Sequence, residues 1–314
     1  MKTVYPDYYP QFRCIADRCV HNCCIGWEID IDPVTLRRYL LMDGPLGERL
    51  RQSIAFDADG AHFELDAQKR CLMLNQNGLC DLITEAGDGA LCGICRDHPR
   101  FRNRLRGVEE IGLGLCCEAA CKLILDGKQR PQLIMVDDGR SKAAPTEPEQ
   151  RYITRREEML DLIWADGMDP NSAMKSLLRD YYGCPEHLPF TPKQWARTFL
   201  LLEHMEASWA DRLNQLRESP PRFDDIPPKD ALKAKQLLTY FLYRYAIQGW
   251  KRRRTRYNSA VAFCVLSVHM IFALSERPED LYETARQYSA EIEYSDINVK
   301  KLLEKFDRYA EAHL

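Results

Sequence analysis

The chain has 314 residues, of which 45% are hydrophobic and 29% are charged. This length and composition fit one large or two ordinary soluble domains, and they exclude a disordered chain or a small disulfide-stabilised toxin. Lysine and arginine total 44 against 47 acidic residues, so the net charge of −3 gives no global attraction for nucleic acid or an anionic membrane. We therefore expect neither partner.

Two segments bear on localisation. Residues 1–12 are polar and rich in tyrosine, without the apolar core of a secretory signal. The longest apolar run, residues 260–274, is too short to span a bilayer and contains Ser267 and His269. These features predict a cytoplasmic protein.

The first 136 residues predict an irregular, cysteine-rich metal-binding domain with short elements. Residues 28–32 alternate between polar and apolar side chains, which indicates a short strand. Pro33 then suits the first turn of a helix over residues 33–42. Residues 56–66 carry an Asp-Gly pair between alternating flanks, which indicates a β-hairpin.

A change of composition separates this domain from the rest of the chain. Residues 137–150 contain the glycine, serine and proline that are typical of a linker. From residue 151 to 314, apolar residues recur three and four positions apart, which predicts a bundle of about six helices. Thr191 and Ser295 are expected helix starts. The predicted fold class is mainly α, with a cysteine-rich domain over 1–136 and a helical domain over 151–314.

Eleven of the 13 cysteines fall in the first 121 residues, and this uneven placement carries most of the information. In a chain expected in a reducing compartment, thiols at this density favour a metal or cluster over disulfides. Cys184 and Cys264 stand alone in helical sequence, where burial as small hydrophobic side chains is the favoured interpretation.

Short spacings between the cysteines indicate a metal centre. Thiolates are soft ligands that select zinc or iron–sulfur clusters, and spacings of two to four residues let a loop wrap around one centre. The candidates outnumber the four positions of a tetrahedral zinc, but spacing alone leaves both kinds of centre open. Gly26 replaces the third cysteine of a radical-type Cys-x3-Cys-x2-Cys motif, so that motif is absent. The groups are Cys14-x4-Cys19-x3-Cys23-Cys24, Cys71-x8-Cys80, Cys92-x2-Cys95 and Cys116-Cys117-x3-Cys121.

The residues around the cysteines form a recognisable pattern. It comprises Phe12-Arg13-Cys14, Cys23-Cys24-x-Gly26-Trp27, Ile29-Asp30-Ile31-Asp32, Arg70-Cys71-Leu72, Asn77-Gly78-Leu79-Cys80, Cys95-Arg96, His98-Pro99-Arg100 and Cys117-Glu118-Ala119-Ala120. This pattern resembles the flagellin lysine-N-methylase family, mainly over residues 12–125. The resemblance implies transfer of methyl groups from S-adenosylmethionine to surface lysines of flagellin, and cysteines associated with a [4Fe-4S] cluster.

The resemblance also implies a set of metal ligands. The cysteines that match the family pattern are Cys14, Cys19, Cys23, Cys24, Cys71, Cys80, Cys95 and Cys117. Cys92, Cys116 and Cys121 are then additional thiols. His98 stands where an aromatic residue is expected before Pro99, so a stacking role at this position is in question.

The cofactor site cannot be of the usual dinucleotide type. Both Gly-x-Gly starts lack the third glycine of the fingerprint, because Cys117 and Cys92 occupy its place. This disfavours a doubly wound methyltransferase. Arg96 and Arg100 flank Cys95, and we expect them to bind the carboxylate of S-adenosylmethionine and to offset the charge of a thiolate cluster.

Four arginines recur at every second position and would share one face of an extended segment. They are Arg100, Arg102, Arg104 and Arg106. Such a face could bind a carboxylate or an acidic protein surface. For the last three arginines, a solvated face paired with Glu109 and Glu110 is favoured.

The sequence therefore predicts a protein-lysine N-methyltransferase that acts on flagellin. A lysine amine must lose its proton before it attacks the methyl carbon, but no single Asp, Glu or Tyr stands out as the base. The alternative is a noncatalytic protein that binds or senses iron or zinc.

Overall fold

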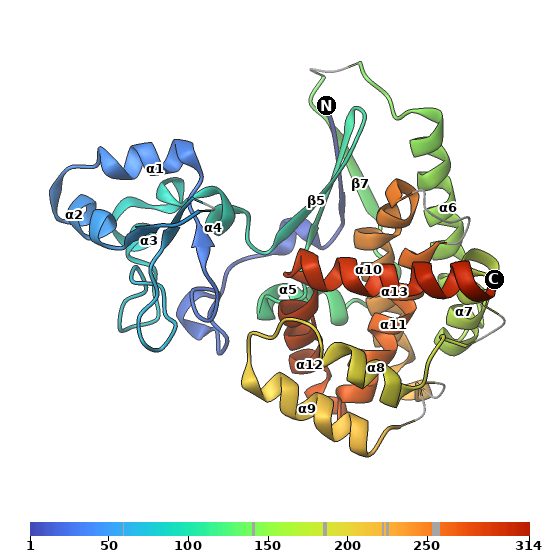
Figure 1. Ribbon diagram of the computed structural model, residues 1–314. Helices are drawn as coiled ribbons and strands as arrows, with labels where there is room; N and C mark the ends of the chain where they lie inside the picture. Colours follow the sequence, from blue (N-terminus) through green and yellow to red (C-terminus); the bar gives the residue numbers. More distant parts are fainter. Residues whose placement is uncertain (59, 140–141, 185–186, 222, 224–225, 253–257) are drawn as a thin grey trace. The chain divides into compact units, whose positions relative to one another are not determined.

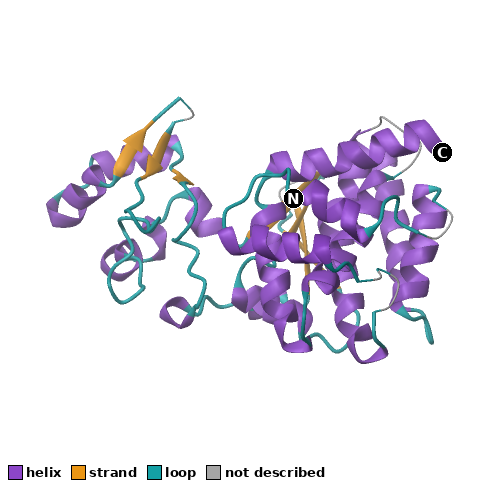
Figure 2. Cartoon of the chain, turned by 60° about the horizontal axis from the view of Figure 1, so that its bottom comes forward, coloured by secondary structure: helices purple, strands orange, loops and turns teal. Residues whose placement is uncertain are grey.

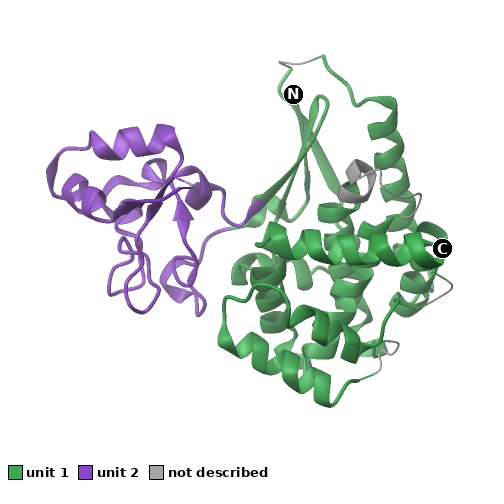
Figure 3. Cartoon of the chain, viewed as in Figure 1, with its two compact units in different colours: residues 1–12, 101–314 green, residues 13–100 purple. Residues whose placement is uncertain are grey.

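A computed structural model describes residues 1–58, 60–139, 142–184, 187–221, 223, 226–252 and 258–314 (Figure 1). The fold is mainly α, as predicted (Figure 2). The chain forms two compact units (Figure 3). Unit 2 consists of Arg13–Arg100, and unit 1 consists of Met1–Phe12 together with Phe101–Leu314.

Unit 2 is built from short elements around a small core. They are the 3-10 turn η2 (Ala16–Arg18), β2 (Ile29–Asp30), α1 (Pro33–Leu40), α2 (Gly44–Gln52), β3 (Ile54–Phe56), β4 (Ala61–Phe63), α3 (Asp81–Ala86), the 3-10 turn η3 (Asp88–Ala90) and α4 (Gly93–Asp97). The strands form an antiparallel sheet in the order β2-β4-β3. Tyr39, Leu50, Phe63 and Leu82 are almost completely buried in the core. The predicted strand, helix and hairpin are thus confirmed.

Unit 1 contains a four-stranded sheet in the order β5-β6-β1-β7. Its strands are β1 (Lys2–Pro6), β5 (Arg100–Leu105), β6 (Val108–Leu113) and β7 (Leu133–Asp137). Strand β1 pairs in parallel with β6 and antiparallel with β7. The start of the chain therefore lies between two strands that follow it by more than a hundred residues.

The rest of unit 1 is helical. Its α-helices are α5 (Glu118–Leu125), α6 (Glu147–Trp164), α7 (Pro170–Leu177), α8 (Pro192–Phe199), α9 (Ala207–Glu218), α10 (Ala231–Arg252), α11 (Ser259–Leu274), α12 (Leu281–Tyr288) and α13 (Asp296–His313). Single π-helical turns continue α7 over Leu178–Tyr182 and α12 over Ser289–Glu293, and 3-10 turns lie at Tyr9–Gln11, Pro228–Asp230 and Pro278–Asp280. Within the described ranges, eight α-helices therefore follow residue 146, rather than about six.

Helix α11 forms the centre of unit 1. Nearly all of its side chains are buried, including Phe263 and Cys264. It packs closely against α10, and α13 also contacts it. Across the described part of the chain, no helix combines the length and the hydrophobicity needed to cross a membrane.

The expected division into domains 1–136 and 151–314 differs from the two units. Strands β1, β5, β6 and β7 belong to the helical unit. The reason is hydrophobic: Val4, Leu105 and Leu113 are buried in one continuous core with the side chains of the long helices. The free energy gained by burying this shared apolar surface places the strands in the helical unit, although their local sequence resembles that of the cysteine-rich segment.

The expected linker over 137–150 also overlaps regular structure. Helix α6 begins at Glu147, and Thr146 caps it through reciprocal hydrogen bonds with Glu149. Pro148 lies in the first helical turn, where proline costs no backbone hydrogen bond. A proline that had indicated a linker is therefore part of a helix start.

A buried ion pair connects the sheet of unit 1 to α6. The guanidinium of Arg156 donates to both carboxylate oxygens of Glu110, at 2.8 and 2.7 Å. The two side chains are only 1% and 2% exposed. Tyr152 accepts a further hydrogen bond from Arg156, so the charges are both paired and hydrogen-bonded. A paired charge of this kind is costly to break from one side.

We expect Arg156→Met to lower the free energy of unfolding by about 3–5 kcal/mol, because it leaves the Glu110 carboxylate buried without its partner. The double variant Glu110→Leu/Arg156→Met should recover most of this loss. Urea unfolding measures both. Arg151→Met breaks an exposed pair with Glu147 and is the matched control, with an expected change below about 1 kcal/mol. Equal losses in both single variants would contradict this interpretation.

A candidate thiolate centre

Five thiols gather in the core of unit 2. Cys71 and Cys92 are buried there, and Cys24, Cys80 and Cys95 pack against the same cluster. The backbone brings them together: the amide of Cys71 donates to the carbonyl of Cys24 at 2.8 Å. Cys80 forms a β-bridge with Leu74, three residues after Cys71. Ligand candidates from distant parts of the sequence thus converge.

Cys23 adds a sixth thiol next to Cys24, and four of the six thiols form two hydrogen-bonded pairs. The thiol of Cys24 donates to the sulfur of Cys23, which lowers the pKa of Cys23 and raises that of Cys24. In the same way, the hydrogen bond from Cys95 lowers the pKa of Cys92 to about 7 and raises that of Cys95. The Cys92–Cys95 pair therefore readily supplies one thiolate near neutral pH, and the hydrogen bond from Cys24 favours the thiolate at Cys23.

The other two thiols, Cys71 and Cys80, interact electrostatically with both pairs. Negative charge at Cys71 and Cys80 raises the pKa of both Cys24 and Cys95. Burial itself raises the pKa of Cys71 to about 11, and it also raises the pKa of Cys80. The six thiols share one neighbourhood in which a cation is needed to hold them all deprotonated.

Asp32 positions one of the pairs. Its Oδ1 accepts a hydrogen bond from the amide of Thr35, at the start of α1, and its Oδ2 accepts one from Gly93, at the start of α4. These hydrogen bonds, with that from Gly93 the strongest, lower the pKa of Asp32 to about 2. Cys92 immediately precedes α4 and Cys95 lies within it, so Asp32 fixes the segment that presents both thiols.

Trp27 and His98 support the other pair. The indole N–H of Trp27 donates to the carbonyl of Cys23 at 2.6 Å. The His98 ring lies edge-on to Trp27, with 5.5 Å between ring centroids. Burial lowers the pKa of His98 to about 4, so the ring is neutral at pH 7. His98 thus makes an edge-on aromatic contact at the position where a stacking role was in question.

The other three predicted ligands are not among these six thiols. Cys14 is exposed, and its sulfur accepts a hydrogen bond from the amide of Ala16. Cys19 ends the turn η2 on the segment that leads to Cys23. Cys117 precedes α5 and belongs to unit 1. These three residues stay predictions as ligands, whereas Cys92, set aside as additional, lies in the group of six thiols.

The i, i+3 spacing of Cys92 and Cys95 was the available signal for this site. At the start of α4, this spacing puts both sulfurs on one side of a helical turn. The family pattern includes Cys95 but not Cys92, and for this reason Cys92 was counted as an additional thiol. The spacing therefore adds Cys92 to the candidate ligands.

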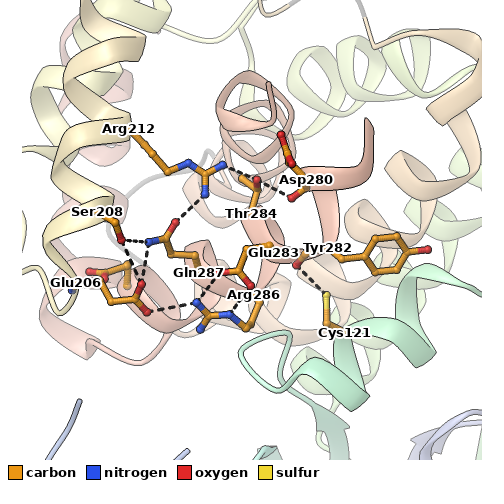
Figure 4. Close-up of polar contacts among 11 residues, drawn as sticks. Cys121, Glu206, Ser208, Arg212, Asp280, Tyr282, Glu283, Thr284, Arg286 and Gln287 are labelled. Atoms are coloured by element: carbon orange, nitrogen blue, oxygen red, sulfur yellow. Dashed lines mark hydrogen bonds and ion pairs between the residues drawn. The ribbon is translucent and has the colours of Figure 1, made fainter. Parts of the chain in front are cut away.

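Cys121 has a packing role in unit 1. Its side chain is 1% exposed, and its thiol donates to the carbonyl of Tyr282 at 3.5 Å (Figure 4). Burial raises its pKa, which makes it a poor thiolate. Cys184 and Cys264 are also buried in the core, so the interpretation of these two as small hydrophobic side chains is confirmed.

Figure 4 also shows a network of polar contacts between α9 and α12. Arg212 on α9 donates to Gln287 and Thr284 on α12, at 2.7 and 2.6 Å. Gln287 in turn donates to Glu206 and Ser208, which lie at the start of α9. The network joins α9 to α12 through mutually satisfied polar groups, as a structural role requires.

The arginines next to the thiols have mixed roles. Arg96 lies in α4 and is exposed. Arg100 donates to the carbonyl of Arg96 at 3.2 Å, which braces the turn between α4 and β5. Arg102 and Arg104 both pair with Glu109, at 2.9 and 3.2 Å. The favoured interpretation of a paired arginine face therefore holds for these two residues through Glu109, whereas Glu110 is buried and pairs with Arg156.

The donor set fits a thiophilic metal group. Five thiols lie in or against an apolar core and Cys23 adjoins Cys24, and soft thiolate ligands select zinc or iron–sulfur centres over hard cations. Side chains from four separate segments contribute, so a bound centre would cross-link them. The fold and the donor set define a cysteine-cluster protein with a large helical unit.

Comparison with known proteins agrees with the resemblance predicted from the motifs. The chain is 26% identical over 127 residues to the flagellar biosynthetic protein FliU of Salmonella muenchen, covering 38% of this chain and 75% of FliU. It is equally similar to the Lysine-N-methylases of Salmonella typhimurium and Salmonella choleraesuis, of which the match covers 32%. The match thus spans about a third of those two relatives' length. No family model and no solved structure matches the chain.

Cys92→Ser should lose most of the bound metal and lower the melting temperature, because metal binding energy counts as folding energy in such a centre. Elemental analysis and thermal unfolding measure the two effects. Cys184→Ser, at a buried thiol outside the group of six, is the control and should keep its full metal content. Full metal content and an unchanged melting temperature in Cys92→Ser would show that Cys92 is not a ligand.

Proposed function

We propose that this protein transfers methyl groups from S-adenosylmethionine to lysine side chains of flagellin, with an iron–sulfur centre held by the thiols of unit 2. The observation that carries the proposal is the convergence of six thiols in a segment rich in motifs of the flagellin lysine-N-methylase family. The names of the relatives support lysine methylation. The reduced thiols suit the cytoplasm.

The number of thiols favours an iron–sulfur cluster over a single zinc. A tetrahedral zinc binds four ligands, each thiolate at about 2.3 Å. Six candidate thiols are more than one such zinc can bind, and cysteine thiolates are the usual ligands of iron–sulfur clusters.

The chain's own residues have two tasks in this reaction. When bound, an iron–sulfur cluster supplies either a structural cross-link or an iron that binds the amino and carboxylate groups of the cofactor. Arg96 and Arg100 flank Cys95, where their charge can hold the same carboxylate and offset the thiolates. The lysine amine must reach the methyl group unprotonated, which a desolvated site favours.

The protein purified without oxygen should be brown, with broad absorption at the blue edge of the visible spectrum. Iron and acid-labile sulfide should be present in comparable amounts. The reason is that thiolate-to-iron charge transfer absorbs visible light, whereas zinc has a filled d shell and does not. Colourless protein with stoichiometric zinc and no sulfide would contradict the iron–sulfur assignment.

Incubation of the metal-loaded protein with S-adenosylmethionine and flagellin from its own source should add methyl groups to exposed lysines, as seen by mass spectrometry. Arg100→Ala should reduce the rate more than Arg104→Ala, because Arg100 lies near Cys95 while Arg104 is 78% exposed and paired with Glu109. Metal content is measured in both variants. No added methyl group, despite a loaded centre and confirmed cofactor binding, would instead favour a noncatalytic metal-binding or sensing protein.

A further inference from the structure

A second set of ligating side chains lies in unit 2, apart from the thiols. Glu28, Asp57 and His62 each direct one ligand atom to a common point, and these atoms all lie within 4.8 Å of one another. Within the described ranges, this is the one set of three or more His, Cys, Asp or Glu residues that meets this distance. It combines an imidazole with two carboxylates, so it is not simply an acidic surface.

The three-stranded sheet explains why these residues meet. His62 lies in the central strand β4, opposite Asp30 of β2 and Ala55 of β3. Glu28 precedes β2 by one residue and Asp57 follows β3 directly, so both flank His62 diagonally. Neighbours of His62 on its own strand, Ala61 and Phe63, are buried on the other face. The sheet therefore presents the imidazole and both carboxylates on one face.

One of the carboxylates is fixed before any ligand binds. Asp57 Oδ1 accepts a hydrogen bond from the amide of Gly60 at 3.0 Å, in the turn between β3 and β4. This leaves Oδ2 directed at His62. The histidine is also well held, since its side chain is only 13% exposed. Two of the three ligand atoms are thus largely preorganised.

The distances fit a shared ion better than direct hydrogen bonds. His62 Nδ1 lies 3.6 Å from Glu28 Oε1 and 3.6 Å from Asp57 Oδ2. Both separations exceed the range of about 2.7–3.2 Å for an N–H···O hydrogen bond. Ligands held at about 2.0–2.2 Å from one tetrahedral ion would be about 3.4 Å apart. Small movements of the three side chains toward one another would bring their ligand atoms to that separation.

We propose that Glu28, Asp57 and His62 form a binding site for one divalent transition-metal ion of the manganese-to-zinc group, separate from the thiolate centre. Imidazole suits zinc and iron, while carboxylates suit manganese, so the mixed set suits ions of this group, including manganese, which thiolates bind poorly. Glu28 and Asp57 remain 53% and 44% exposed, so water fills the other coordination positions. The ion would join three strands and stabilise unit 2, independently of any methyl transfer.

Manganese is the suitable probe because thiolates compete poorly for it. Anaerobically purified full-length protein, with its thiolate centre loaded, is titrated with Mn²⁺ and followed by electron paramagnetic resonance. We expect one bound Mn²⁺, with a pulsed-resonance coupling to one imidazole nitrogen. Mn²⁺ should also raise the melting temperature, because an ion that binds only the folded state stabilises it.

His62→Ala should remove the nitrogen coupling and weaken Mn²⁺ binding at least about tenfold. Glu28→Gln and Asp57→Asn keep the side-chain shape and should weaken binding to a similar degree, which separates loss of a ligand from loss of fold. Glu48→Gln removes an exposed carboxylate on α2 and is the matched control, with unchanged binding. No bound Mn²⁺, or equal affinity in His62→Ala and the unchanged protein, would overturn the proposal.

Discussion

The convergence of thiols in unit 2 is the constraint on which the rest of this account depends. The strands of this unit have only two or three residues, and its helices are short. Elements of that length bury little apolar surface, and small domains usually need a metal or another cross-link to be stable. Here the cysteines come from the segments around 23, 71, 80 and 92, so one centre can connect most of the unit. The binding energy of such a centre, once bound, would then count as folding energy.

Unit 1 is stable for a different reason. It has a large apolar core in which Trp195, Trp209 and Phe263 are completely buried, and α11 lies at its centre. Arg212 and Gln287 form a hydrogen-bonded network between α9 and α12. Three of its cysteines are buried and inert: Cys184 and Cys264 fill space, and Cys121 donates to a carbonyl. The same residue type therefore serves as packing at these positions and as candidate ligand in unit 2, according to what surrounds it.

Local sequence signals predicted local structure well and failed for long-range pairing. Asp32 and Pro33 mark the start of α1, and Thr191 marks the start of α8, because caps act within a few residues. By contrast, β1 pairs with β7 across more than a hundred residues, and no spacing in the sequence reveals that partner. The expected domains differ from the two units for this reason. In the candidate site, the spacing of Cys92 and Cys95 could be read from the sequence. Only the fold shows that Asp32 accepts a hydrogen bond from Gly93 and so fixes the segment that carries both thiols.

The most direct test of the central claim is X-ray absorption at the iron edge of the anaerobically purified protein. The account predicts a first coordination shell dominated by sulfur and a second shell of iron, because thiolates and bridging sulfides surround several irons in one cluster. Parallel data from Cys92→Ser should show less of both signals. An iron shell made only of nitrogen and oxygen, or no iron–iron scattering in the unchanged protein, would contradict a thiolate-held cluster in unit 2.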